Sequence, residues 1–95
     1  MNASLLAPRE RIVITGLGVV TPCGIGIGPF WESLMQRRSG IDWIRGFDTS
    51  QIYCKIGGEV RGFDPSDYMD PKWAKRSGRF STFAVAAARL AVEDS

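Results

Sequence analysis

The chain has 95 residues, of which 44% are hydrophobic and 23% charged, and its formal net charge is +2. This hydrophobic content excludes a disordered tail, and the charge is too small to indicate a nucleic-acid-binding domain. The sequence contains no histidine, so it holds no Cys–His or Ser–His–Asp site and no zinc site with histidine ligands. Because a chain of this size buries little surface, we expect the isolated segment to be poorly stable.

The N-terminal residues predict a leader over 1–10, followed by a buried strand. Leu5-Leu6-Ala7 is too short for the apolar region of a signal peptide, and no run approaches the roughly 18 apolar residues of a membrane span, so we expect a soluble, cytoplasmic protein. Ile12-Val13-Ile14-Thr15 is apolar and β-branched, which is typical of a strand covered on both faces. Gly16 and Gly18 continue this strand and indicate a close backbone approach.

The same glycines match a dinucleotide-binding turn only in part. Gly16-Leu17-Gly18 supplies the first two glycines of G-x-G-x-x-G, whereas Thr21 occupies the third position and Pro22 follows it. We therefore favour a packing role for these glycines over nucleotide binding, and we expect no cofactor and no bound metal.

A turn over 21–28 then leads to a helix predicted over 29–38. Pro29 suits the first helical turn, Arg37 and Arg38 suit the last, and Gly40 is a plausible stop. The apolar residues of this helix share one face: Phe30, Trp31, Leu34 and Met35.

The middle of the chain predicts a loop over 41–54, a short strand over 55–60 and irregular structure over 61–69, where Pro65 breaks any regular element. Cys23 and Cys54 are too few for a disulfide framework, and we interpret both as reduced thiols.

Asp70-Pro71 is an N-cap followed by a first-turn proline, and it predicts a helix that continues to the end of the sequence. Its apolar face repeats at helical spacing: Phe80, Phe83, Ala84, Ala87, Leu90 and Ala91. Four cations at i, i+3, i+4 and i+7 would share another face: Lys72, Lys75, Arg76 and Arg79. Taken alone, this pattern favours a solvated helix face, and the alternative is a docking site for an acidic partner.

Taken in order, these residues resemble the start of the β-ketoacyl-[acyl-carrier-protein] synthases over 11–95. The resemblance is closest to the elongating enzymes, synthase II. Its landmarks are R-I-V-I-T-G-L-G-V-V-T-P-C-G at 11–24, F-W-E-S-L at 30–34, S-G-I at 39–41, F-D-T-S at 47–50, G-G-E-V at 57–60, F-D-P at 63–65, the basic stretch at 72–76 and the alanine-rich helix ending in E-D-S.

The resemblance implies an α/β protein with the thiolase-like five-layer αβαβα fold, of which this chain is the first part of the N-terminal half. It also implies an acyltransferase that performs a decarboxylating Claisen condensation with malonyl-acyl-carrier protein in fatty acid elongation. In that family a cysteine at a helix N-terminus carries the acyl group and two histidines support the reaction. Neither Cys23 nor Cys54 matches the position of that nucleophile, so we assign no catalytic residue to this chain.

The resemblance does imply a partner site. Lys72, Lys75 and Arg76 align with the cations by which the elongating enzymes dock acyl carrier protein, and this reverses the preference for a merely solvated face, while Arg79 departs from the family pattern. The family also implies a homodimer. Three alternatives stay open: a type II polyketide synthase, its non-catalytic chain-length partner, or a small module that binds acyl carrier protein.

Overall fold

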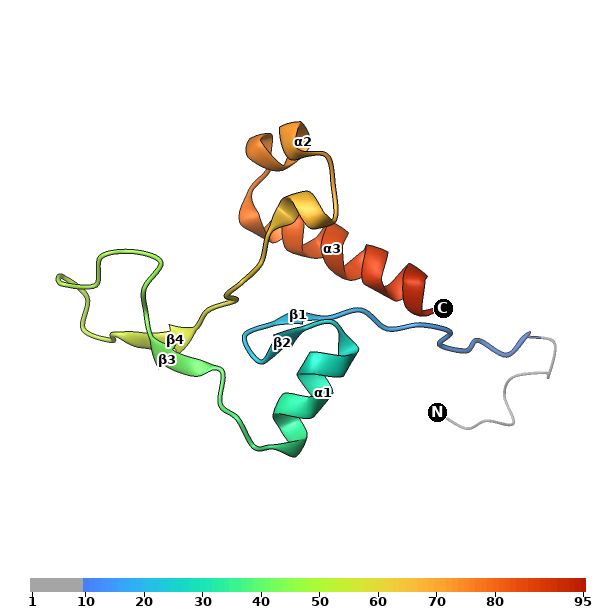
Figure 1. Ribbon diagram of the computed structural model, residues 1–95, viewed down its shortest axis with the longest axis horizontal. Helices are drawn as coiled ribbons and strands as arrows, with labels where there is room; N and C mark the ends of the chain where they lie inside the picture. Colours follow the sequence, from blue (N-terminus) through green and yellow to red (C-terminus); the bar gives the residue numbers. More distant parts are fainter. Residues whose placement is uncertain (1–9) are drawn as a thin grey trace.

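Short strands and helices alternate along the chain in the computed structural model, which describes residues 10–95 (Figure 1). The leader predicted over 1–10 therefore lies, except for Glu10, outside the described residues. In chain order the elements are β1 (Val20–Thr21), β2 (Gly24–Ile25), α1 (Ile27–Met35), β3 (Ile41–Trp43), β4 (Ile56–Gly58), the 3₁₀ turn η3 (Pro65–Asp67), α2 (Pro71–Arg76) and α3 (Arg79–Asp94).

The strand predicted over Ile12–Thr15 is wrong for the described structure. Residues 11–19 are extended without strand pairing, and only Val20–Thr21 pairs, in an antiparallel register with Gly24–Ile25. A strand needs a neighbouring backbone for its ladder of hydrogen bonds, and in residues 10–95 the apolar segment has none. Ile12 and Ile14 are accordingly 89% and 81% exposed.

The close packing predicted for Gly16 and Gly18 is confirmed, and its partner is α3. A Cβ atom on Gly16 would overlap the carbonyl oxygen of Ala91, and one on Gly18 would overlap the carbonyl oxygen of Ala87. The backbone N–H of Leu17 donates to Asp94 Oδ2 at 2.9 Å, across 77 positions of sequence. Residues 16–18 are thus held against α3, and Figure 1 shows this part of the chain passing close to the end of that helix.

The helix predicted over 29–38 exists, but it begins two residues earlier and ends at Met35. Pro29 falls in its first turn, where a proline is tolerated. The helix ends because Arg37 adopts a left-handed conformation, with φ of 57°. The N–H of Arg37 bonds to the carbonyl of Leu34 and that of Arg38 to the carbonyl of Ser33, which is the Schellman pattern. Both arginines thus follow the helix instead of forming its last turn.

Buried polar contacts hold α1 on the β1–β2 hairpin. Ser33, which is 7% exposed, donates its hydroxyl to the carbonyl of Cys23 at 2.6 Å. Thr21 Oγ1 closes the hairpin by donating to the carbonyl of Gly24 and accepting from its N–H. The apolar face predicted for this helix stays largely uncovered, since Trp31 is 60% and Met35 66% exposed.

The loop predicted over 41–54 is partly wrong, because it contains β3. This strand pairs antiparallel with β4, in the register Ile41↔Gly58, Asp42↔Gly57 and Trp43↔Ile56. The strand predicted over 55–60 is confirmed in the shorter range of β4. Between them, residues 44–55 form a long excursion that projects to the left in Figure 1.

The single long helix predicted from Asp70 onward is broken into two. Its start is confirmed, since Asp70 Oδ1 accepts the N–H of Lys72 at 2.9 Å. Ser77 and Gly78 then take extended backbone angles, with ψ of 145° and 158°, and α3 begins at Arg79. On α3, Thr82 and Ala86 are buried, while Phe80, placed on the apolar face by its spacing, is 81% exposed.

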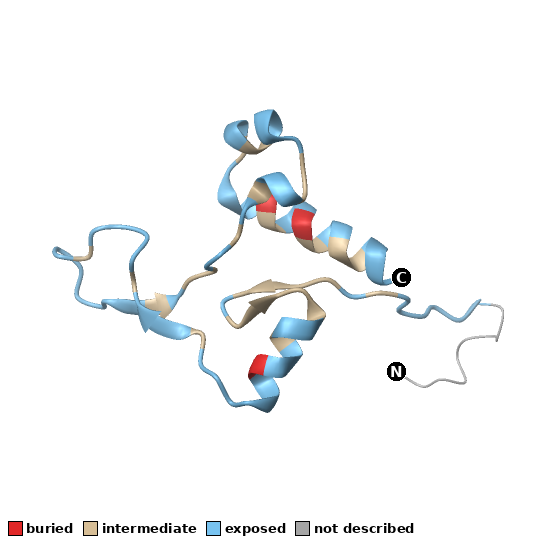
Figure 2. Cartoon of the chain, viewed as in Figure 1, coloured by how far each residue is buried: buried red, intermediate tan, exposed pale blue. Residues whose placement is uncertain are grey.

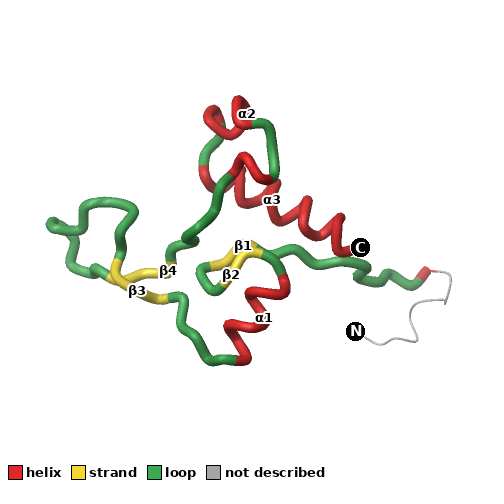
Figure 3. Tube along the Cα trace, viewed as in Figure 1, coloured by secondary structure: helices red, strands yellow, loops and turns green. Residues whose placement is uncertain are grey.

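The described chain has very little interior (Figure 2). Ala86 is its one fully buried hydrophobic residue. Phe63 forms the centre of a small aromatic cluster, stacking on Tyr68 and meeting Phe83 edge-on at 5.0 Å between ring centroids. Much of the path is loop (Figure 3), and the radius of gyration is 17.6 Å, against ~13 Å for a compact domain of about 100 residues. No helix within residues 10–95 has the length and apolarity to cross a membrane.

We predict that Gly18→Ala destabilises the intact protein by about 1–3 kcal/mol, because the added methyl group collides with the backbone of α3. The measurement is the free energy of unfolding by denaturant titration. Gly28→Ala is the matched control: a Cβ atom there meets nothing within 4 Å, so stability should stay unchanged or rise by up to about 1 kcal/mol. Equal stability of Gly18→Ala and the wild type would contradict the proposed packing.

Candidate functional site

The groups that usually perform covalent or acid–base catalysis are sparse in the described residues. Cys23 is partly buried beside Gly40, and Cys54 is exposed, with its thiol 3.4 Å from the carbonyl of Ile56. Both are free thiols, and no histidine accompanies either. Within residues 10–95, no three His, Cys, Asp or Glu side chains gather in a group that could hold a metal. A binding surface is therefore the site to consider.

The short helix α2 carries such a surface. Asp70 caps its first turn and Pro71 occupies its first position, so the helix begins where the sequence predicts. Ser77 ends it, donating its hydroxyl to the carbonyl of Trp73 at 2.9 Å. The helix packs on η3 and otherwise stands apart at the top of Figure 1, exposed along most of its length in Figure 2.

Three of the four cations predicted to share a face do so. Lys72, Lys75 and Arg76 lie at i, i+3 and i+4 of α2 and are all exposed. Among the described residues, none of their side chains forms an ion pair, in contrast to Arg45, Arg61 and Arg89, each of which has a carboxylate partner. We call these three residues the α2 cation cluster. Its charge is available to an approaching anion.

Arg79 does not belong to this cluster, which corrects the prediction of four cations on one face. The break at Ser77–Gly78 moves Arg79 onto α3. There its guanidinium donates to the carbonyl of Val60 at 2.6 Å and lies 5.0 Å from the centre of the Phe83 ring. Arg79 therefore links α3 to the segment after β4, which is a structural contact.

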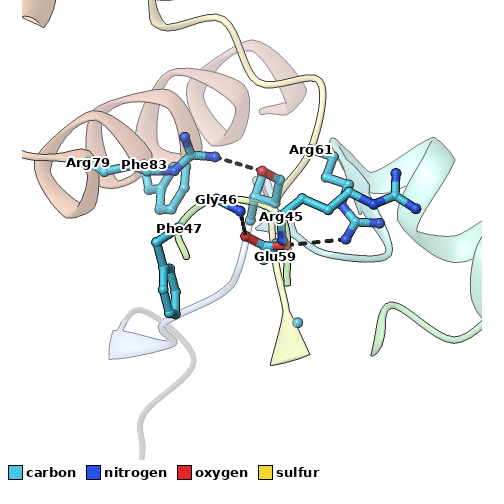
Figure 4. Close-up of a pocket in the computed structure, with 9 residues that line it drawn as sticks. Arg45, Gly46, Phe47, Glu59, Arg61, Arg79 and Phe83 are labelled. Atoms are coloured by element: carbon cyan, nitrogen blue, oxygen red, sulfur yellow. Dashed lines mark hydrogen bonds and ion pairs between the residues drawn. The ribbon is translucent and has the colours of Figure 1, made fainter. Parts of the chain in front are cut away.

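A second polar feature, which no pattern in the sequence had indicated, lies where the chain leaves β3 and β4 (Figure 4). Glu59 accepts the backbone N–H groups of Arg45 and Gly46, each at 2.8 Å, and the guanidinium of Arg61 at 3.2 Å. Arg61 also reaches Asp42 Oδ2 at 3.1 Å and the carbonyl of Trp43 at 2.7 Å. Gly46 was a possible signal, because only a residue without a side chain lets the backbone come so close to Glu59: a Cβ atom there would lie 2.6 Å from Oε2.

These contacts hold both carboxylates in the ionised form. Hydrogen bonds, first from the backbone N–H of Arg45, lower the pKa of Glu59 below its usual value of 4.5. The backbone N–H of Trp43 and then the guanidinium of Arg61 lower the pKa of Asp42. A carboxylate with its oxygens occupied and its pKa lowered is poorly suited to proton transfer at neutral pH. We interpret Glu59 as an anchor for residues 45 and 46.

The anchor shapes a hollow of about 600 Å³ between the hairpin and α3. Phe47 and Phe83 supply apolar surface, while Arg45, Arg61 and Arg79 supply charge at its edge (Figure 4). All three arginines are already engaged, Arg45 and Arg61 by Asp42 and Arg79 by the carbonyl of Val60. The hollow thus has few free polar groups with which to orient a ligand.

Comparison with known proteins identifies the family. The family described as the β-ketoacyl synthase N-terminal domain matches residues 9–95. This match covers nearly the whole sequence and includes the glycine segment, the hairpins and α2. The chain belongs to the β-ketoacyl synthase family.

Several named relatives are 3-oxoacyl-[acyl-carrier-protein] synthases 2. That of Synechocystis is 45% identical over 87 residues, which cover 92% of this chain and 21% of the relative. Those of Coxiella burnetii and Staphylococcus aureus are 42% and 37% identical, covering 92% and 95% of this chain. The chain thus spans about a fifth of the length of the curated relatives it matches.

A solved structure supports the fold. The structure titled the ishigamide ketosynthase/chain length factor superposes with a TM-score of 0.79 at 36% identity, covering 86% of this chain and 20% of that chain. The likeness to a ketosynthase confirms the predicted α/β, thiolase-like class for the part of the fold that this chain supplies.

We predict a pH-dependent role for the Glu59 anchor, tested by Glu59→Gln in the intact protein. Because the pKa of Glu59 is lowered in the folded state, its ionised form contributes stability above the unfolded pKa, and this is lost as pH falls through the folded value. The Tm of the variant should therefore lie below that of the wild type at neutral pH, and the gap should narrow below about pH 4.5. A gap that stays constant with pH would contradict this role.

Proposed function

We propose that this chain is the N-terminal part of a 3-oxoacyl-[acyl-carrier-protein] synthase, an acyltransferase of fatty acid elongation. The enzyme would join an acyl thioester to malonyl-acyl-carrier protein in a decarboxylating Claisen condensation. The support is the identity of 45% to the Synechocystis synthase 2, together with the collinear landmarks over residues 11–95. Within this proposal, residues 1–10 are a leader and 11–95 are the first part of the synthase domain.

The chemistry of this reaction assigns its catalytic groups to other parts of the protein. Loss of carbon dioxide from the malonyl group leaves a carbanion, which attacks the acyl thioester carbon and displaces the cysteine thiolate. The reaction needs a low-pKa thiol and fixed donors for the thioester oxygen. With no histidine and with Cys23 and Cys54 in a turn and a loop, this chain does not supply that set. As proposed, the condensation itself uses neither a metal nor a cofactor.

The contribution that we propose for this chain is to dock the substrate carrier. The observation that carries this proposal is the α2 cation cluster, Lys72, Lys75 and Arg76, exposed and without ion-pair partners in residues 10–95. Cations on a projecting helix attract an acidic protein and orient its approach. The partner we propose is acyl carrier protein, which is part of the name of the related synthases. The remaining proposals are a cytoplasmic location and a homodimer.

We predict that Lys75→Glu with Arg76→Glu in the intact enzyme raises the KM for acyl-carrier-protein substrates about tenfold at low salt, because two attractive charges become repulsive. The measurement is steady-state kinetics with the carrier-bound substrate and with the same acyl group on a small thiol. The KM for the small thioester should not change, since it does not touch α2. The effect should also shrink as salt is raised.

Arg37→Glu with Arg38→Glu is the matched control, because it reverses two adjacent, exposed arginines located just after α1. We expect its KM for the carrier-bound substrate to stay within about twofold of the wild type, as is typical of charges outside an interface. Equal effects of the two double variants would mean that net charge alone matters, and the docking site would be rejected.

The ketosynthase/chain length factor title of the structural neighbour favours a second candidate: a type II polyketide synthase or its non-catalytic chain-length partner. An acyl-transfer assay on the intact protein separates these. A synthase should gain the mass of one acyl group when incubated with an acyl thioester, as its cysteine exchanges with the donor thiol. A chain-length partner that lacks the cysteine should gain none.

A further inference from the structure

The α2 cation cluster borders a hollow that the docking proposal does not use. This hollow of about 240 Å³ is lined by Asp70, Lys72, Trp73 and Arg76. Lys72 and Arg76 stand one turn apart on the helix, and Trp73 lies between them in sequence. An apolar surface is therefore framed by two of the three cations of the cluster.

Trp73 is placed for contact with a partner. It is 45% exposed, and no hydrogen bond of its indole N–H forms within residues 10–95. The carboxylate of Asp70, also in the hollow, is occupied by the N–H of Lys72 at 2.9 Å, so it serves the helix cap. The hollow combines an uncovered aromatic ring with positive charge at its rim.

We infer that Trp73 is the apolar anchor of the docking surface, receiving an apolar side chain that is flanked by carboxylates on the acidic carrier protein. This inference rests on the proposed carrier-protein docking. Charge complementarity selects the occupant: carboxylates on either side of the apolar residue would meet Lys72 and Arg76 while the residue itself covers the indole.

The two kinds of contact have different physical consequences. Exposed cations mainly raise the association rate and fix the orientation, and salt screens them. A tryptophan covered at the centre of an interface, with polar groups around it excluding water, commonly supplies much of the affinity and slows dissociation. Burial of the indole is apolar and depends little on salt. Trp73 should therefore determine how long the carrier stays bound.

The test is the Kd of the intact protein for acyl carrier protein at low and high salt, for Trp73→Ala and Trp73→Phe. We expect Trp73→Ala to raise the Kd about tenfold at both salt concentrations, mainly through faster dissociation, and Trp73→Phe to raise it less. Trp43→Ala is the matched control, because Trp43 is another exposed tryptophan, 62% exposed, on β3. Its Kd should match that of the wild type.

The outcomes separate this inference from the docking proposal. If Lys75→Glu with Arg76→Glu weakens binding while Trp73→Ala leaves the Kd unchanged, docking is purely electrostatic and the anchor is rejected. If neither variant weakens binding, the docking site itself is rejected. If Trp73→Ala also lowers the Tm and raises the KM for the small thioester, Trp73 has a packing role and the anchor is again rejected.

Discussion

The structure depends on the contact between the glycine segment and the last helix. Gly16 and Gly18 allow the backbone to lie directly against α3, where side chains would collide with the carbonyls of Ala91 and Ala87. The hydrogen bond from Leu17 to Asp94 fixes the ends of this contact. Because α3 is held there, the aromatic cluster around Phe63 has a surface to pack on, and α2, which precedes α3, stands outward from that base.

Local chemistry in the sequence was a good guide wherever a residue acts on its immediate neighbours. The Asp70 cap and the first-turn proline were predictable because each acts on the adjoining helical turn. The close approach at Gly16 and Gly18 was predictable from the glycines, but its partner, α3, was not. The interpretation of 12–15 as a strand had the right residue types, but strand formation requires a partner that periodicity cannot reveal. The same limit hid β3, which pairs with β4 and with no other strand among residues 10–95.

In the candidate site, too, local contacts were predictable from the sequence and long-range contacts were not. Lys72, Lys75 and Arg76 could be placed together because they lie within one helical turn of each other. Arg79 was misplaced because the helix breaks at Ser77–Gly78, where glycine disfavours a helix interior by about 1 kcal/mol relative to alanine. The Glu59 anchor binds Arg45 and Gly46, which precede it by 14 and 13 positions in the sequence. No local pattern encodes contacts over such a separation. The break separates the three exposed cations of α2 from Arg79, whose guanidinium contacts Val60 and Phe83.

The contact between Leu17 and Asp94 can form only after a delay during translation. Residues 16–18 must wait for residues 87–94 before they have a surface to lie on, because the Leu17–Asp94 bond spans 77 positions. At the ~5–20 residues per second of translation, that interval is roughly 4–15 s. Ile12 and Ile14 stay exposed even when this contact has formed, and an unpaired, extended segment of β-branched residues offers its backbone to another chain. The delay therefore leaves residues 16–18, together with this apolar stretch, extended and unpaired until α3 has been made.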